Sequence, residues 1–115
     1  MIFCVKLHIQ YGPGLFESVY EELLCYELQK RGLDFTRQED IELIHDNQKM
    51  GIGFKADIIV EELVLVELKS VVELGKVHYK QVQTYLKLTG IKLGLLINFN
   101  EALMKDGIHR IVNNL

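Results

Sequence analysis

The feature that most constrains this chain is the stretch over residues 54–70, which reads FKADIIVEELVLVELKS. Two apolar runs flank an acidic turn, a pattern typical of a buried β-hairpin. Three ionisable residues interrupt the apolar runs, namely Asp57 in the first and Glu67 and Lys69 in the second. Side chains of a strand alternate between its two faces, so Glu67 and Lys69 point to the same face. Two acids and a lysine at one edge of a sheet could hold a divalent cation against a phosphate.

The apolar residues around these charges argue against an ordinary surface ion pair. Exposed cross-strand pairs with such spacings are common and contribute less than about 1 kcal/mol. The second run is apolar at nearly every other position, so we expect it to form a central, buried strand. Charged side chains are rare in such strands unless a partner or a ligand compensates them. The apolar residues of this run are Leu63, Val64, Leu65, Val66 and Leu68.

The length of the turn decides whether Asp57 and Glu67 can meet. A two-residue turn would place Asp57 opposite Val66, and the two carboxylates would then lie on opposite faces of the sheet. A three-residue loop over residues 61–63, or a β-bulge, would bring both carboxylates to one face. We therefore predict an odd-numbered loop or a bulge, and a regular two-residue hairpin would exclude a shared metal site.

The oxygen ligands in this hairpin suit a hard divalent cation. Magnesium prefers carboxylates and retains several waters, and Asp57 and Glu67 would bind it together with the backbone carbonyl of Leu68. A bound Mg²⁺ or Mn²⁺ polarises a phosphate and lowers the pKa of a bound water. Lys69 would assist the attack of that water and stabilise the charge that develops on the phosphate. The hairpin therefore predicts metal-assisted hydrolysis of a phosphodiester bond.

Turn residues and hydrophobic periodicity divide the chain into helices and strands. Short turns make the first three strands an antiparallel meander, and the second helix lets the next strand join in parallel through a right-handed crossover. We therefore expect an α/β fold in a single domain over residues 1–115, with a mixed sheet flanked by helices. The expected helices cover residues 15–32 and 76–89, the expected strands cover residues 34–44, 50–60, 63–69 and 92–99, and residues 108–112 fit either a strand or a short helix.

Each predicted helix has one apolar face. In the second helix Gln81 interrupts this face and shares it with Tyr85, four residues later. The two residues either hold a water, a metal ligand or the substrate, or form a helix-edge amide packed against a core tyrosine. Glu17 borders the apolar face of the first helix, where the helix dipole favours an acid. The predicted faces are Phe16, Val19, Tyr20, Leu23, Leu24 and Leu28 in the first helix and Val77, Gln81, Tyr85 and Leu88 in the second.

Charge and cysteine content limit the partners. A formal net charge of −3 is not that of a tight nonspecific DNA binder. Between residues 69 and 92, however, five lysines stand against one acid, and lysines are common phosphate contacts. The two cysteines have no metal-ligand spacing, so we expect buried thiols and a cytoplasmic location. No apolar run reaches the length of a membrane span and no leader opens the chain, so we expect no membrane partner.

Several segments together resemble a known protein family over nearly the whole chain. They read GPGLFESVYEELLCYELQKRGL, GFKADIIVEELVLVELKSV, QVQTYLKLTG and LGLLINFN, and they are similar in order and spacing to the GxxxExxY family of the PD-(D/E)XK nuclease superfamily. The resemblance implies a restriction-endonuclease-like core, in which a helix precedes a β-meander, a second helix and a further strand. Asp57 matches the first motif acid, and Glu67 and Lys69 match the (D/E)XK element. Glu17 matches a first-helix acid that completes the metal site in many members.

The resemblance also implies supporting residues and marks a departure. Gln81 and Tyr85 match a QxxxY motif found in exonuclease-like branches, and Tyr20 matches a signature tyrosine with a packing role. Lys6 stands where the family usually has an acid, and the initial helix looks short, as if truncated. With little room for target recognition, we expect sequence-specific cleavage only with a partner or as a homodimer.

Three functions are therefore open. The first is a Mg²⁺-dependent or Mn²⁺-dependent nuclease that acts on DNA or another nucleic acid. The second is a catalytically weak or inactive binding or assembly module that retains the nuclease fold. The third is an enzyme for another phosphate substrate, for which the chain offers no pocket-building motif.

Overall fold

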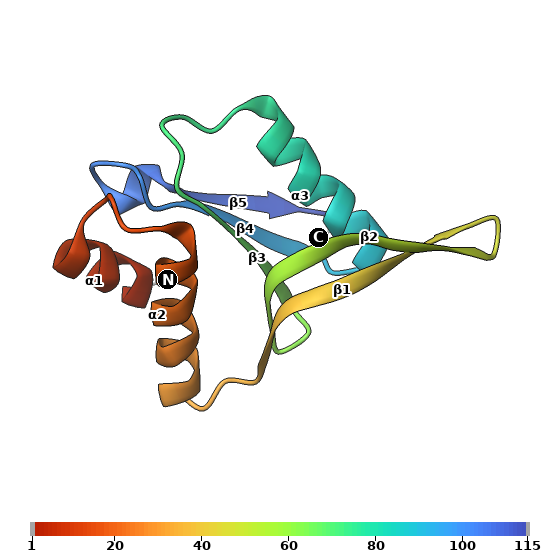
Figure 1. Cartoon of the computed structure of the whole chain (residues 1–115), viewed down its shortest axis with the longest axis horizontal. Coiled ribbons are helices and arrows are strands. Elements are labelled where there is room, and N and C mark those ends of the chain that lie inside the picture. The colour runs from red at the N-terminus through yellow and green to blue at the C-terminus, as the bar shows by residue number, and fades with distance from the viewer. Residues whose placement is uncertain (1, 115) are drawn as a thin grey trace.

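Two helices, three strands, a third helix and two further strands follow one another along the chain, much as the sequence predicts (Figure 1). The structure is a computed structural model that describes residues 2–114, with the side chains of residues 4–114. Its elements are α1 (Ile2–Tyr11), α2 (Glu17–Lys30), β1 (Phe35–His45), β2 (Gln48–Val60), β3 (Val64–Lys69), α3 (Lys76–Thr89), β4 (Leu93–Asn98), a 3₁₀ turn η1 (Met104–Asp106) and β5 (Ile108–Val112).

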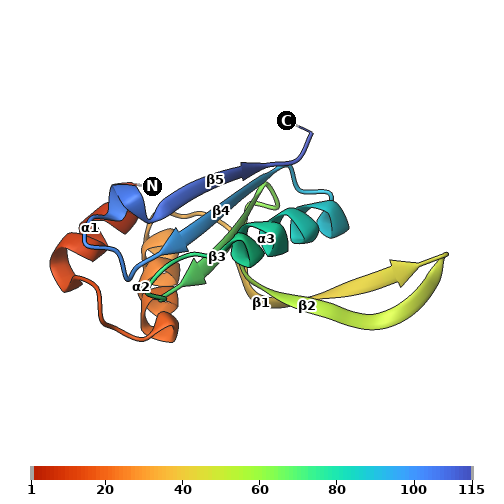
Figure 2. The same ribbon diagram turned by 90° about the horizontal axis from the view of Figure 1, so that it is seen from above.

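The five strands form one sheet whose order follows the chain, β1-β2-β3-β4-β5. The first three strands are antiparallel neighbours, α3 carries the chain across so that β4 lies parallel to β3, and β5 is antiparallel to β4. The α1 and α2 helices lie at one side of this sheet and α3 covers its other face (Figure 2). The predicted α/β fold, a meander plus a parallel strand flanked by helices, is confirmed, and the ambiguous segment over residues 108–112 is a strand.

The turn between β2 and β3 has the odd length that the site requires. Val60 pairs with Val64, so residues 61–63 form a three-residue loop. The two glutamates of this loop have φ angles of 52° and 58°, and the Leu63 backbone N–H donates to the Val60 carbonyl at 2.9 Å. The prediction of an odd-numbered loop is confirmed. Leu63, predicted as the first residue of the strand, is instead an exposed loop residue.

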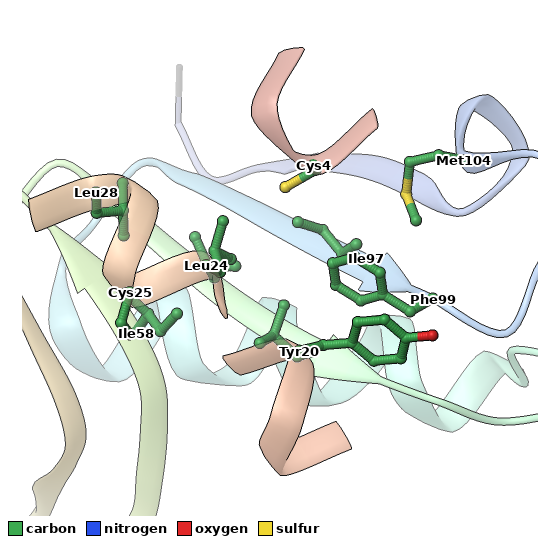
Figure 3. Close-up of a cluster of buried hydrophobic side chains, with 11 residues drawn as sticks. Cys4, Tyr20, Leu24, Cys25, Leu28, Ile58, Ile97, Phe99 and Met104 are labelled. Atoms are coloured by element: carbon green, nitrogen blue, oxygen red, sulfur yellow. The ribbon is translucent and has the colours of Figure 1, made fainter. Parts of the chain in front are cut away.

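The core lies on both faces of the central strand β3. On the side of α1 and α2 the buried side chains include Tyr20, Leu24 and Phe99 (Figure 3). Cys4 and Cys25 lie in the same cluster, and burial raises the pKa of the first thiol to about 12 and of the second to about 11. The prediction that both thiols are buried is therefore confirmed. The cluster under α3 consists of Ala56, Ile59, Leu65, Val82, Leu86, Leu96 and Ile111.

The predicted apolar face of α2 is confirmed at Tyr20, Leu24 and Leu28 and is wrong at its N-terminal end. In α2, Phe16 and Val19 are exposed. The buried residues of this helix are Tyr20, Glu21, Leu24, Cys25 and Leu28. Glu21 can lie on this face because Arg37 of β1 pairs with it at 2.9 Å.

The predicted face of α3 is right only for Tyr85, which packs against the core cluster. The buried residues are Val82 and Leu86, whereas the predicted residues Val77 and Leu88 are exposed. The sheet below this helix supplies the reason. A Cβ atom on Gly94 of β4 would lie 2.8 Å from a methyl group of Val82, so the glycine allows this face of the helix to approach the strand.

Two further segments differ from the predicted boundaries. The start of the chain forms the helix α1, in which His8 is buried and its Nε2 lies 2.6 Å from the Glu101 carbonyl oxygen. The β1–β2 hairpin ends in a two-residue turn at Asp46 and Asn47, shorter than the gap over residues 45–49 between the predicted strands. Its outer half extends as an arm away from the rest of the sheet (Figure 1). Among residues 2–114, no helix is both long and apolar enough to cross a membrane.

Candidate active site

The site begins where β2 and β3 cease to pair. Ile58 of β2 and Val66 of β3 form the last pair of this ladder. Beyond this pair lie Asp57 on β2 and Glu67 on β3. The Asp57 backbone N–H donates to Glu67 Oε1 at 3.3 Å, and the Leu68 N–H donates to Asp57 Oδ2 at 2.9 Å. The structure therefore brings both predicted carboxylates into one notch between the strands.

A distortion in the neighbouring ladder turns Asp57 toward this notch. Gln38 and Asp57 do not pair, although the residues on either side of them do, and Gln38 has a φ of 47°. Ala56 and Ile59 pack into the same cluster under α3 although they are three residues apart, so the regular alternation of faces is broken between them. Asp57 therefore lies at the point where the regular alternation of β2 is broken.

The backbone carbonyl of Leu68 faces the same notch. Its N–H points toward β2, because it bonds to the Asp57 carboxylate. The N–H and C=O groups of one strand residue point to the same side of the strand. The Leu68 carbonyl oxygen is therefore directed to the side where Asp57 lies, as predicted for a third oxygen ligand.

Glu17 and Lys69 complete the surroundings of the two carboxylates. Glu17 is the first residue of α2, and its pKa is raised by partial burial and by the charge of Asp57, while Lys69 and a hydrogen bond from the Ser70 backbone lower it. The first turn of α2 thus lies near the end of β3. Lys69 is half-buried. It lies two residues after Glu67 in β3, so the two side chains point to the same face of the sheet.

Both notch carboxyl groups resist ionisation. Burial, followed by the charge of Asp57, raises the pKa of Glu67 to about 8, against the opposing effect of Lys69. Burial also raises the pKa of Asp57, although hydrogen bonds from Leu68 and Gln38 act in the other direction. Each of these groups is more easily ionised when a cation lies beside it.

Of the two predicted helpers on α3, only Tyr85 lies beside the site. Its ring stacks on Phe54 with centroids 3.7 Å apart and an interplanar angle of 6°. Burial, with the charges of Glu67 and Asp57, raises its pKa. Gln81 is exposed, and within the part of the chain that the structure describes no side-chain hydrogen bond joins it to the site.

Tyr20 supports the loop that leads to Glu17. Its buried ring stacks on Phe99 with centroids 4.1 Å apart. Its hydroxyl donates to the Gly12 carbonyl and accepts the Leu15 N–H at 3.3 Å. The packing role that the resemblance implies for this tyrosine agrees with these contacts.

Two residues next to the site were missed from the sequence. Glu21 is buried on α2 and accepts hydrogen bonds from Arg37 at 2.9 Å and from Gln38 Nε2 at 2.6 Å. Gln38 Nε2 also donates to Asp57 Oδ1 at 3.2 Å. The only signal for Glu21 is its position one helical turn after Glu17, and no local pattern marks Gln38.

A third overlooked residue is Asn98, the last residue of β4. It is fully buried, its Oδ1 accepts the Val71 N–H at 3.1 Å and its Nδ2 donates to the Val71 carbonyl at 2.9 Å. These bonds fix the chain two residues beyond Lys69. The amide therefore stabilises the strand end that carries the lysine.

The available ligands form a small, all-oxygen set. In the part of the chain that the structure describes, no group of three or more His, Cys, Asp and Glu side chains is arranged to hold a metal ion. The set consists of the carboxylates of Asp57 and Glu67 and the Leu68 carbonyl, with Glu17 nearby. Three oxygens, with waters in the remaining positions, fit Mg²⁺ or Mn²⁺.

Comparison with protein families gives one match. A family model described as the PD-(D/E)XK nuclease superfamily matches residues 1–111. Comparisons with curated proteins and with solved structures found no match. The matched range contains every residue of the notch.

Proposed function

This chain belongs to the PD-(D/E)XK nuclease superfamily, and on that basis we propose that it is a metal-dependent nuclease that hydrolyses phosphodiester bonds in DNA. One observation carries the proposal. The three-residue loop over residues 61–63 brings Asp57 and Glu67 into one notch, with Lys69 two residues along the same strand face.

The residues of the notch divide the chemistry between them. Asp57, Glu67 and the Leu68 carbonyl would hold Mg²⁺ or Mn²⁺, with Glu17 as a further ligand on the side of α2. When bound, such a cation polarises the scissile phosphate and lowers the pKa of a water. Lys69 would orient the attacking water and offset the negative charge that develops on the phosphate.

The outer face of α3 supports a nucleic acid as the substrate. At about 100° per residue, Lys76, Lys80 and Lys87 fall within about 40° of one another around the helix. All three are exposed, the helix has no acid, and none of the ion pairs among residues 2–114 involves them. Uncompensated lysines in a row suit the phosphates of a nucleic acid strand.

The finer assignments are part of the same proposal. We place the chain in the GxxxExxY family because Glu17 and Tyr20 have the ExxY spacing of its motif, although the nearest glycine, Gly14, lies three residues before Glu17 and Pro13 stands four before it. A homodimer would supply the target-recognition surface that one protomer lacks. The expected cytoplasmic location also remains a proposal.

Cleavage of DNA tests the function directly. Supercoiled plasmid and single-stranded oligonucleotides are incubated with Mg²⁺, with Mn²⁺ or with a chelator. We expect metal-dependent cleavage that is lost in Glu67→Gln and in Lys69→Ala. Glu73→Gln, which changes an exposed acid outside the notch, is the matched control and should cleave normally. Equal cleavage by all of these variants would assign the activity to a contaminant.

A binding or assembly module with little or no activity is the second candidate. One observation favours it, a groove of about 720 Å³ that is lined by four acids and no base, which does not suit a nucleic acid. The acids of this groove are Asp34, Glu39, Glu61 and Glu62. Metal binding that is lost in Glu67→Gln, without cleavage by the parent protein, would favour this reading.

A further inference from the structure

The Asp57 carboxylate is held from two strands at once. Leu68 of β3 donates its backbone N–H to Oδ2 at 2.9 Å. From the opposite side, Gln38 of β1 donates from Nε2 to Oδ1 at 3.2 Å. One donor on each oxygen sets the plane of the carboxylate and leaves further lone pairs for a cation.

The amide of Gln38 is itself fixed by the first helix. Its Nε2 also donates to Glu21 Oε1 at 2.6 Å, and the other oxygen of Glu21 accepts from Arg37 at 2.9 Å. Glu21 is 8% exposed, so the acceptor end of these two bonds is shielded from water, whereas Gln38 and its bond to Asp57 are exposed. A continuous chain of polar contacts therefore joins α2 to Asp57.

The backbone of Gln38 is strained for a residue with a side chain. Its φ of 47° lies in the left-handed region, which costs a residue other than glycine about 1–2 kcal/mol. The β1–β2 ladder lacks its Gln38–Asp57 pair, although the pairs directly on either side, Arg37–Ile58 and Glu39–Ala56, are in register. Strain of this kind persists only where the surrounding structure enforces it, and it is concentrated at functional sites.

We infer that Gln38 is the positioning residue that orients the Asp57 carboxylate toward a divalent cation, with Glu21 holding the amide in place. This inference rests on the metal site of the proposed function. The amide acts through the carboxylate. In metal sites, loss of such a supporting hydrogen bond weakens the affinity about 10-fold to 100-fold.

Two substitutions separate the side chain of Gln38 from its backbone. Gln38→Met retains the length and the strained backbone but removes the donor. Gln38→Gly removes the donor and also relieves the left-handed strain. We expect both variants to bind Mn²⁺ at least about ten times more weakly than the parent protein, and the glycine variant to remain as thermally stable as the parent.

The measurement is the dissociation constant of Mn²⁺ by calorimetry at one alkaline pH, with circular dichroism to verify folding. Glu22→Gln is the matched control, because Glu22 also pairs with Arg37, at 2.8 Å, but does not contact Gln38. It should bind Mn²⁺ like the parent. If Gln38→Met does not fold, Gln38→Gly alone decides the comparison.

Each outcome separates this inference from the nuclease proposal. Parent-like Mn²⁺ affinity in the folded Gln38 variants overturns the inference and leaves the nuclease proposal intact. Weaker binding in these variants, in a protein that does not cleave DNA, supports the inference while the nuclease proposal fails. A parent protein that does not bind Mn²⁺ overturns both.

Discussion

Asp57 and Glu67 face each other across the notch between β2 and β3, and the backbone N–H of the aspartate donates to Oε1 of the glutamate at 3.3 Å. Glu67 is 5% exposed, and burial with the charge of Asp57 raises its pKa above the ordinary range. Ionisation of the two carboxyl groups therefore destabilises the folded protein as long as no cation compensates their charge. Stability and metal binding should both follow the protonation of this pair.

The first prediction concerns Glu67 and the stability of the metal-free protein. The pKa of Glu67 is about 8 in the folded protein, against an ordinary value of 4.5 in the unfolded chain. Between these two pH values the folded protein keeps the Glu67 carboxyl protonated, whereas the unfolded chain does not. The stabilisation by the neutral carboxyl is complete below the unfolded pKa and is lost as the pH rises through the folded pKa. Glu67→Gln retains the Oε1 acceptor without the charge, and should raise Tm by several degrees at pH 8 but little at pH 5.

Thermal unfolding in a chelator at the two pH values measures this difference. Glu22→Gln removes an exposed carboxylate and should change Tm equally little at both. A Glu67→Gln variant that is less stable than the parent at pH 8 would contradict the prediction that ionised Glu67 destabilises the folded protein.

The second prediction is that metal binding releases protons near neutral pH. A cation requires Asp57 and Glu67 to be ionised, whereas the raised pKa of Glu67 keeps a proton on the pair. The affinity for Mn²⁺ should therefore increase between pH 6 and pH 8, and level off at higher pH. Calorimetry in two buffers with different ionisation enthalpies counts the released protons, and a flat pH dependence would exclude the pair as the ligand set.

The third prediction concerns the loop that sets the register. Glu62 is exposed and has a φ of 58°, which glycine adopts without the cost paid by other residues. Relief of about 1–2 kcal/mol of left-handed strain exceeds the entropic cost of glycine, about 0.5–1 kcal/mol, so Glu62→Gly should raise the free energy of unfolding by up to about 1 kcal/mol and leave Mn²⁺ affinity unchanged. Glu42→Gly, at an exposed β1 position outside the left-handed region, should instead destabilise the protein. Chemical denaturation compares the two variants.

The register of the hairpin was predictable because it depends on a local count. Asp57 and Glu67 can share a ligand only on one face, and the two-residue period of strands then requires an odd loop. The order of strands and the parallel crossover also follow from the spacing of elements. These features need no knowledge of distant residues.

The burial of Glu21, the inward face of α3 and the positioning of Asp57 were not predictable, because all three depend on partners far away in the chain. Glu21 is buried only because Arg37 and Gln38 of β1 bond to it. The inward face of α3 depends on Gly94, which comes after that helix. Hydrophobic periodicity treats a glutamate as an outward residue and a glycine as featureless, so it misplaces both.

The fourth prediction tests the support of the α2 start by Tyr20. Tyr20→Phe retains the stack on Phe99 but leaves the Gly12 carbonyl and the Leu15 N–H without their partner. We expect the free energy of unfolding to fall by about 1–2 kcal/mol. Tyr26→Phe, at a residue that is 62% exposed, should change it by less than about 0.5 kcal/mol. Urea denaturation of both variants decides whether the hydroxyl has this role.

The fifth prediction concerns the lysines on the outer face of α3. If Lys80 and Lys87 contact phosphates, their double substitution by glutamine should weaken DNA binding and reduce the slope of log affinity against log salt by about two. The matched control replaces Lys49 and Lys105, which are also exposed and change the net charge equally. Binding is measured by fluorescence anisotropy in a chelator, so that cleavage does not interfere. A general loss of positive charge would weaken DNA binding equally in both double variants. A larger loss of affinity in the α3 variant would therefore support DNA contact with this helix, whereas equal losses would contradict it.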